Sequence, residues 1–211
     1  MIELRSVSAG YRGRQVLTSI SLAVAPGECV GLIGPSGSGK TTLLRCLTGE
    51  VRPTSGDIRI GGWVPGRASP PPGTLGVVWQ DPVAALDQRW TIEACVAEPL
   101  QAARHPDSRG AARKALAEVR LGHLDPSQRV CRLSVGQAQR VALARALAGR
   151  PKAIIADEPT SALDPTNAAA IVSMLHKAAG DGAATLVVSH NEALLSAFCT
   201  RIVAIDGLAS L

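Results

Sequence analysis

The stretch Gly34-Pro35-Ser36-Gly37-Ser38-Gly39-Lys40-Thr41 combines three glycines, a lysine and a hydroxyl at a spacing suited to holding phosphate. The glycines let the backbone bend so that successive N–H groups turn inward and form an anion-binding nest. An apolar run, Cys29–Ile33, precedes the stretch, and a helix is expected from about Lys40, whose N-terminus adds partial positive charge there. Lys40 would reach the β- and γ-phosphates, and the Thr41 hydroxyl would bind Mg²⁺. We therefore predict that the chain binds a nucleoside triphosphate, the alternative being a glycine-rich turn that matches by chance.

Two adjacent carboxylates, Asp157 and Glu158, follow directly on the apolar run Ala153–Ala156. Ligands bind at the carboxyl ends of the strands in an open parallel sheet. Asp157 fits a Mg²⁺ partner acting through water, since hard cations favour carboxylate oxygens. Glu158 is placed to orient or deprotonate a water for in-line attack on the γ-phosphate. Such a pair is often merely solvated, but its occurrence beside a phosphate loop favours the functional interpretation.

Three single residues are weaker candidates for the same site. Gln80 ends an apolar run and could contact the metal or the attacking water. His190 follows another run and could hydrogen-bond the γ-phosphate and hold Glu158 and the water, although a lone histidine there is more often incidental. Tyr11, the only tyrosine, lies in a turn and could stack on a purine ring, although an exposed turn tyrosine usually has no such role.

A second anion site is predicted where Leu133-Ser134-Val135-Gly136-Gln137 opens a helix that runs to Gly149. Ser134 is a suitable N-cap, and Gly136 leaves the backbone bare in the first turn. Free N–H groups at a helix N-terminus attract anions. Because one chain already has a complete phosphate loop, this second site makes sense if it faces a nucleotide held by another subunit. The arrangement suggests dimerisation as a hypothesis.

The elements that position these residues follow from hydrophobic periodicity. The alternating stretches Ile2–Ser8 and Leu17–Ala25 predict antiparallel strands ahead of the phosphate loop. Strands alternating with helices elsewhere predict a mainly parallel sheet with helices on both faces. The remaining predicted strands are Cys29–Ile33, Asp57–Ile60, Leu75–Trp79, Ala153–Ala156, Thr185–Ser189 and Ile202–Ile205, and the predicted helices are Lys40–Leu47, Pro165–Ala179 and Glu192–Phe198.

The region from Thr91 to Gly149 lacks strand signals, and Ala, Leu, Arg and Glu recur in it at helical spacing. Thr91 can cap a helix through Leu100, and Ser108 can cap one through Leu121 with Gly122 at its end. We predict an α/β fold of the P-loop NTPase type with an N-terminal antiparallel part and an inserted helical part. A single domain would span 1–211, with residues 1–80 and 150–211 as the core and about 81–149 as the helical part.

Composition excludes a disordered or fibrous chain, since 46% of the 211 residues are hydrophobic and 18% are charged. The basic residues behind the net charge of +5 are dispersed along the chain. This pattern favours a mildly basic, solvated surface first, a position near anionic lipid second and DNA binding third. The five cysteines form no C-x-x-C pair, so we expect reduced thiols and a cytosolic compartment. No signal segment or membrane-spanning run is recognisable, so we expect a soluble chain whose membrane role comes through a partner.

Taken in order along nearly the whole chain, these residues resemble the ATP-binding-cassette (ABC) ATPase family. Tyr11 corresponds to the adenine-stacking loop and Gln80 to the Q-loop. The Walker A loop corresponds to the range from Gly34 through Thr42. Leu133–Gln137 corresponds to the signature motif, Ala153–Glu158 to Walker B, Ser161-Ala162-Leu163-Asp164 to the D-loop and His190 to the switch histidine. The resemblance implies two ATPs with Mg²⁺ held between two such domains, each signature helix facing the other chain's phosphates. Ser134, Gly136, Gln137 and Asp164 would complete the nucleotide site.

The resemblance also implies partners: a second ATPase subunit, identical or not, transmembrane permease subunits at the cytoplasmic face of the cell membrane, and an extracytoplasmic solute-binding protein. No nucleic acid is expected. One departure is Val135, which stands where the family signature usually has glycine, so we expect a working but weakened opposite site, as in an asymmetric heterodimer. The segment Trp79–Asp87, together with the following Trp90–Ile92 and Ala97–Leu100, resembles the oligopeptide, dipeptide and nickel importer subgroup.

Two rival functions stay open at this point. A soluble ABC ATPase can act as a clamp in DNA repair, translation or enzyme assembly, usually with two cassettes, coiled-coil arms or metal-cluster domains, none of which is visible here. An ordinary P-loop kinase is the other rival, and the signature helix argues against it.

Overall fold

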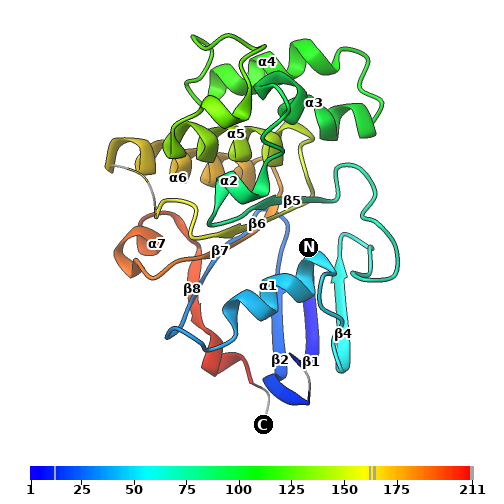
Figure 1. Cartoon of the computed structure of the whole chain (residues 1–211). Coiled ribbons are helices and arrows are strands. Elements are labelled where there is room, and N and C mark those ends of the chain that lie inside the picture. The colour runs from blue at the N-terminus through cyan, green and yellow to red at the C-terminus, as the bar shows by residue number, and fades with distance from the viewer. Residues whose placement is uncertain (12, 162, 164, 210–211) are drawn as a thin grey trace.

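The strands form two sheets, and the parallel sheet has helices on both faces, as the computed structural model shows for residues 1–11, 13–161, 163 and 165–209 (Figure 1). The antiparallel sheet has the order β2-β1-β4, and the parallel sheet has the order β5-β6-β7-β3-β8. The strands are β1 Ile2–Tyr11, β2 Arg14–Val24, β3 Cys29–Ile33, β4 Ser55–Ile60, β5 Leu75–Val78, β6 Ala153–Asp157, β7 Ala184–Val188 and β8 Arg201–Ala204.

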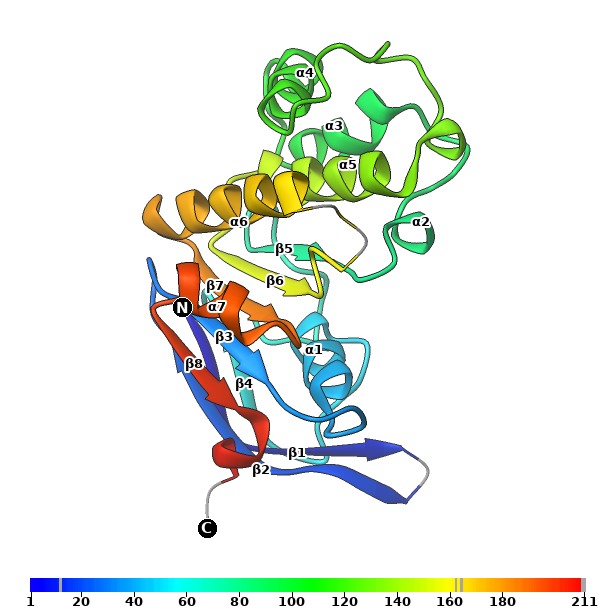
Figure 2. The ribbon, with the colours of Figure 1, turned by 90° about the vertical axis from the view of Figure 1, so that its left-hand side faces the viewer.

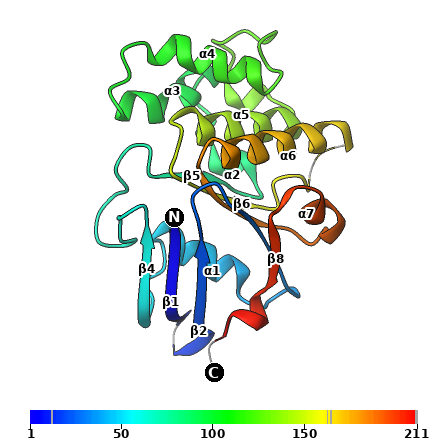
Figure 3. The ribbon, with the colours of Figure 1, turned by 180° about the vertical axis from the view of Figure 1, so that it is seen from behind.

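Nine further elements are helical among the described residues. Seen from behind, α3 to α5 lie in the upper half of the molecule and the antiparallel sheet in the lower half (Figure 3). The α-helices are α1 Lys40–Thr48, α2 Pro82–Ala85, α3 Ile92–Ala102, α4 Ser108–Glu118, α5 Val135–Ala148, α6 Pro165–Gly180 and α7 Glu192–Phe198. The two 3₁₀ turns are η1 Val130–Arg132 and η2 Ile205–Leu208.

The parallel sheet is covered on both faces, as its continuous apolar strands predict. Every residue of β6 and β7 is buried. Ile154 and Ala156 belong to the core beneath α5, α6 and α7, whereas Ala153 and Ile155 belong to the core shared with α1 and the antiparallel sheet. Alternation of side chains across a strand thus divides the apolar residues between two cores.

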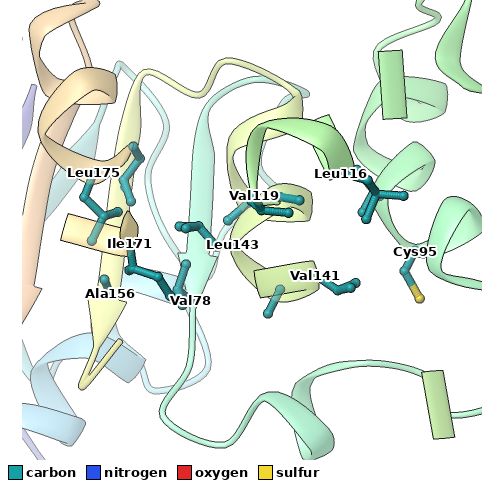
Figure 4. Close-up of a cluster of buried hydrophobic side chains, with 14 of the residues drawn as sticks. Val78, Cys95, Leu116, Val119, Val141, Leu143, Ala156, Ile171 and Leu175 are labelled. Carbon is teal, nitrogen blue, oxygen red and sulfur yellow. The ribbon is translucent and has the colours of Figure 1, made fainter. Parts of the chain in front are cut away.

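One of these cores extends from the parallel sheet into the helical part of the chain. Figure 4 shows its side chains running from Ala156 and Val78 on the sheet, past Leu143 and Val141 on α5, to Leu116. Helix α5 therefore has apolar contacts toward the sheet and toward α3 and α4. Its close approach to the sheet is visible at Gly76 of β5, where a Cβ atom would lie 2.4 Å from the Ala146 carbonyl oxygen.

Predicted elements match these bounds with differences of a few residues, the largest being three residues at the end of β1, the start of β2 and the end of α4. The main correction concerns α4, predicted to be capped by Ser108 and to end at Gly122. Its cap is Asp107, whose Oδ1 accepts from the Gly110 N–H at 2.8 Å. The helix ends earlier because Arg120 adopts a left-handed φ of 60° and Leu121 N–H reaches the Leu116 carbonyl, as in a Schellman motif.

Helix α2 was not predicted, because only four residues form it. Asp81 caps it by accepting from the N–H groups of Val83 at 2.9 Å and Ala84 at 3.1 Å, and Pro82 fits the first turn. Thr91 and Ser134 cap α3 and α5 as predicted. No helix in the described residues has the length and apolar character needed to cross a membrane.

Replacing Gly76 by Ala should destabilise the chain by about 2 kcal/mol, because the new methyl group would overlap a backbone oxygen that cannot rotate away. Chemical denaturation without nucleotide measures this loss. The matched control is Gly180→Ala at the end of α6, where a Cβ atom would meet nothing within 4 Å, and which should change stability by less than about 1 kcal/mol. Equal stability of the two variants would contradict the close packing of α5 on β5.

Candidate functional site

The predicted phosphate loop joins β3 to α1, as its sequence pattern requires. Gly39 occupies the N-cap position of α1 with a left-handed φ of 99°, and no side chain caps the first turn. A Cβ atom at Gly39 would lie 2.7 Å from Leu17 Cδ2, so glycine is needed here for both conformation and space. The uncapped N–H groups of α1 are therefore free to bind an anion.

Lys40 folds back over this loop. Its side chain is nearly buried, and Nζ donates to the Gly34 carbonyl at 2.7 Å and to the Pro35 carbonyl at 2.9 Å. The Ser38 hydroxyl is buried and lacks a hydrogen-bond partner among the described residues. A buried hydroxyl without a hydrogen-bond partner lowers the stability of the fold. A polar ligand bound in the loop could supply the missing partner.

Glu158 is held firmly by the end of the neighbouring strand. Its φ of 44° is left-handed, a conformation that costs of order 1–3 kcal/mol for a side chain of this kind. The Glu158 N–H donates to the Val188 carbonyl at 2.9 Å, while its carboxylate accepts from the His190 N–H at 2.9 Å and from the Ser189 hydroxyl at 3.2 Å. Glu158 is thus held at its backbone N–H and at its carboxylate, and these contacts fix the direction in which the carboxylate points.

His190 contacts Glu158 mainly through its backbone. The imidazole Nε2 lies 3.6 Å from Glu158 Oε1, and the side chain is 57% exposed. The predicted proximity of His190 and Glu158 is therefore present in the structure, but the shortest contact is the amide and not the ring.

Asp157 is the last residue of β6, one position further into the strand than predicted. Its side chain is nearly buried and receives no hydrogen bond within the part of the chain that the structure describes. Burial, followed by the charge of Glu158, raises the pKa of Asp157 above its ordinary value of 3.8, and the charges of Lys40 and His190 act in the opposite direction. A bound cation near Asp157 would stabilise its charged form and offset the cost of burying it.

Gln80 and Tyr11 lie at the margins of the site. Gln80 follows β5, which is the neighbour of β6, and its side chain is exposed. Tyr11 ends β1 at the tip of the β1–β2 hairpin and is 41% exposed. Neither residue has a hydrogen bond to Asp157 or Glu158 among the described residues, so the structure does not join them to these carboxylates, and their roles stay predictions.

The residues predicted to form a second anion site lie at the start of α5. Ser134 Oγ accepts from the Gln137 N–H at 3.3 Å, and Gln137 Oε1 accepts from the Ser134 N–H at 2.9 Å, which together make a capping box. Val135 is 50% exposed. At Gly136, a Cβ atom would lie 3.2 Å from Leu163 Cδ2, so the glycine allows close approach of the segment that follows Glu158.

The start of α5 and the phosphate loop lie toward the same side of the molecule, in its upper and lower halves (Figure 2). The strands β3, β6 and β7 also direct their carboxyl ends to that side. A single chain thus presents two separate phosphate-suited surfaces on one face. The predicted D-loop residue Asp164 lies outside the described residues.

Known proteins decide the family. A family model described as ABC transporter matches residues 17–161. The chain is 36% identical over 217 residues to the glutamine transport ATP-binding protein GlnQ of Escherichia coli (strain K12), covering 98% of this chain and 88% of that protein. The chain belongs to the ABC transporter family.

Other relatives agree with this assignment. The cassette is 36% identical over 210 residues to the zinc import ATP-binding protein ZnuC of Roseobacter denitrificans (strain ATCC 33942 / OCh 114), covering 98% of this chain and 76% of that protein. A solved dimeric ATP-binding cassette in a post-hydrolysis state, bound to ADP and phosphate, matches with a TM-score of 0.87 and 30% identity. That match covers 100% of this chain and 97% of the other.

The family membership and the fold class that the sequence predicted are thereby confirmed, and the cassette is a nucleotide-binding ATPase. The resemblance to the oligopeptide, dipeptide and nickel subgroup stays a prediction, since the relatives compared above are named for glutamine and zinc.

Two residues near the site were missed by sequence reasoning. Ser189 donates to the Glu158 carboxylate, and its place at the end of an apolar run was the only signal. Gln139 is almost fully buried in α5, and its Nε2 donates to the Pro159 carbonyl at 3.0 Å. A polar residue among the apolar positions of the helix, between Ala138 and Val141, could have drawn attention to it.

A separate hollow of about 550 Å³ lies away from these residues. It includes Thr74 and Lys152, which directly precede β5 and β6, so it opens at the amino ends of these strands. The nucleotide-suited groups lie at the carboxyl ends. This hollow is therefore not part of the candidate site.

Asp157→Asn should stabilise the nucleotide-free cassette at pH 7. Because the folded-state pKa of Asp157 is raised, the folded state loses stability relative to the unfolded state as the pH rises from about 3.8 through that pKa, and asparagine avoids this loss. The melting temperature of the variant should therefore rise relative to the parent between about pH 4 and pH 7. The exposed Asp181→Asn is the control and should melt with the parent. A D157N variant that melts lower at pH 7 would refute the cost assigned to this buried charge.

Proposed function

We propose that the cassette is the ATP-hydrolysing subunit of an ABC importer, and that it works in a pair of ATPase subunits bound to transmembrane permease subunits. The pair acts at the cytoplasmic face of the cell membrane and serves an extracytoplasmic solute-binding protein. The observation that carries the proposal is the fixed carboxylate of Glu158 beside a phosphate loop whose helix start is uncapped.

Each residue near the loop has a distinct proposed role. The loop N–H groups and Lys40 hold the triphosphate, with Lys40 exchanging its two carbonyl acceptors for phosphate oxygens. Glu158 orients and deprotonates the attacking water, because its carboxylate is held by Ser189 and the His190 amide. The exposed imidazole of His190 contacts the γ-phosphate, and Tyr11 stacks on the adenine.

The donor groups present also fit Mg²⁺. Asp157 offers a buried carboxylate without a hydrogen-bond donor among the described residues, and Thr41 offers an exposed hydroxyl in the first turn of α1. Gln80 offers an amide oxygen from the adjacent strand end. Oxygen ligands of this kind suit a hard cation. When bound, Mg²⁺ would neutralise charge on the β- and γ-phosphate oxygens.

Dimerisation completes the site in this proposal. Ser134, Gly136 and Gln137 face the nucleotide of the opposite subunit, because the start of α5 and the phosphate loop lie on one face of the chain (Figure 2). Asp164, which lies outside the described residues, belongs to the same proposed nucleotide site. A two-fold rotation about this face would place each α5 start against the partner's loop. The solved dimeric cassette bound to ADP and phosphate supports this arrangement.

Import is favoured over the rival functions because the relatives compared are named for glutamine transport and zinc import. A peptide, nickel or metal-chelate cargo is supported only by the resemblance of Trp79–Asp87. The soluble clamp predicts no membrane partner. Affinity purification from detergent-solubilised membranes separates the two: co-purification of polytopic proteins supports the importer, and their absence supports the clamp.

Glu158→Gln should lower steady-state ATP hydrolysis by about 100-fold or more while ATP and Mg²⁺ still bind and hold the two ATPase subunits together. The amide oxygen can still accept from the His190 N–H, so the fold should be retained. Hydrolysis assays and size-exclusion chromatography with ATP provide the measurements. Glu192→Gln, exposed at the start of α7, should keep the parent rate, and Lys40→Ala should lose nucleotide binding. Rapid turnover by E158Q would exclude Glu158 as the base.

Val135→Gly should raise the ATPase rate of the assembled complex several-fold. The side chain of Val135 is 50% exposed at the first position of α5, so its removal would widen the proposed opposite phosphate site at the loss of only part of a packed side chain. Turnover of the assembled complex at saturating ATP measures the effect, and unchanged melting of the isolated subunit controls for folding. An unchanged rate would show that the valine does not crowd the partner's nucleotide.

A further inference from the structure

Two thiols lie face to face at the end of the parallel sheet remote from the phosphate loop. Cys29 is the first residue of β3, and Cys199 directly follows α7. Their sulfur atoms are 3.5 Å apart. The backbones are also joined, since Thr200 N–H donates to the Cys29 carbonyl at 2.7 Å and Cys29 N–H donates to Thr200 Oγ1 at 3.2 Å.

The elements that carry this pair are packed tightly. A Cβ atom at Gly31 in β3 would lie 3.1–3.3 Å from side-chain atoms of Leu195 in α7, so the strand and the helix are in close contact at this point. Figure 2 shows α7 beside β3. The close packing therefore leaves the backbone little freedom to move at the two cysteines.

The other cysteines are arranged differently. Cys46 and Cys95 are buried in different parts of the apolar core, and Cys131 is exposed. The contact between Cys29 and Cys199 is the sole sulfur–sulfur contact found in residues that the structure describes. All five cysteines are free thiols in this structure.

We propose that Cys29 and Cys199 form a reversible disulfide when the chain meets a hydroperoxide. The Cys199 thiolate attacks one peroxide oxygen, the O–O bond breaks, and Cys199 becomes a sulfenic acid while the other oxygen leaves as hydroxide or alkoxide. Cys29 sulfur then attacks Cys199 sulfur, the S–O bond breaks, and water leaves. The two thiol protons end on the two oxygens, and the two electrons lost by the sulfurs reduce the peroxide.

The surroundings assign the two roles. A hydrogen bond from Cys29 lowers the pKa of Cys199, and Cys199 is only half-buried, so a small peroxide can reach its thiolate. The pKa of Cys29 is raised, first by its hydrogen bond with Cys199 and then by burial. Cys29 is thus the protected resolving thiol and Cys199 the attacking one.

Formation of the bond requires the sulfurs to approach from 3.5 Å to about 2.05 Å, which side-chain rotation can supply because the backbones are already adjacent. The bond would join residues 170 positions apart in the chain. A cross-link that closes so long a loop restricts the unfolded chain strongly. Oxidation should therefore raise the melting temperature of the cassette by several degrees.

The test uses the full-length chain with Cys131→Ser, which removes the exposed thiol and hence cross-links between chains. Treatment with a modest excess of hydrogen peroxide should lower the mass by about 2 Da, yield a peptide pair linked through Cys29 and Cys199, and raise the melting temperature by about 5 °C. Dithiothreitol should reverse all three changes. The matched variants Cys131→Ser/Cys29→Ser and Cys131→Ser/Cys199→Ser should show none of them.

Two results would overturn the proposal. One is progressive oxidation of Cys199 to sulfinic acid in the C131S chain with no linked peptide. The other is a linked form that melts below the reduced form, which would mean that the bond distorts the packing of α7 on β3. Because the serine variants change one atom each, circular dichroism before oxidation separates these results from misfolding.

Discussion

The register of the parallel sheet is the constraint on which the site depends. Val188 of β7 pairs with Leu32 of β3 on one side and with Asp157 of β6 on the other, so β6 and β7 end at the same level and β3 ends one residue beyond them. Only then can the residues that follow β7 hold the residue that follows β6. The left-handed backbone of Glu158 is tolerable because the Val188 carbonyl, the Ser189 hydroxyl and the His190 amide all engage it. A shift of one residue in this register would remove all three contacts and leave the strain.

Helix α5 fixes the helical part of the chain relative to the carboxyl edge of the parallel sheet. Its apolar residues join the sheet's core to α3 and α4, and its contact with β5 permits only glycine at position 76. Gln139 adds one directional link, since its amide donates to the carbonyl next to Glu158 while its Oε1 stays buried without a partner in the described residues. Retaining a buried polar group that is only half satisfied costs stability. That cost is understandable if the distance between the helical part and the Glu158 turn must be fixed.

Much of this could be predicted from sequence because it depends on local rules. The loop glycines, the strand ends bearing Asp157, Glu158 and His190, and the caps Thr91 and Ser134 are each determined by short patterns with one physical solution. What escaped prediction depends on contacts between distant segments. That His190 holds Glu158 through its amide follows from sheet register, and that Arg120 ends α4 follows from tertiary context overriding the preference for glycine.

At the start of α5, most backbone N–H groups already have a hydrogen-bond partner within the chain, so few remain for the proposed contact with a partner's nucleotide. The Ser134 hydroxyl accepts from the Gln137 backbone N–H, the Gln137 side-chain oxygen accepts from the Ser134 N–H, and the Ser134 carbonyl accepts from the Ala138 N–H. Among the backbone N–H groups of this turn, as far as the structure describes the chain, those of Val135 and Gly136 are therefore left without a partner. A valine in place of glycine keeps both donors, so it cannot abolish an anion site by chemistry. In the proposed dimer the effect of Val135 is steric, because a half-exposed branched side chain stands beside the two free N–H groups. The proposed opposite site would then keep its donors, and the Val135 side chain would limit how closely a phosphate approaches them.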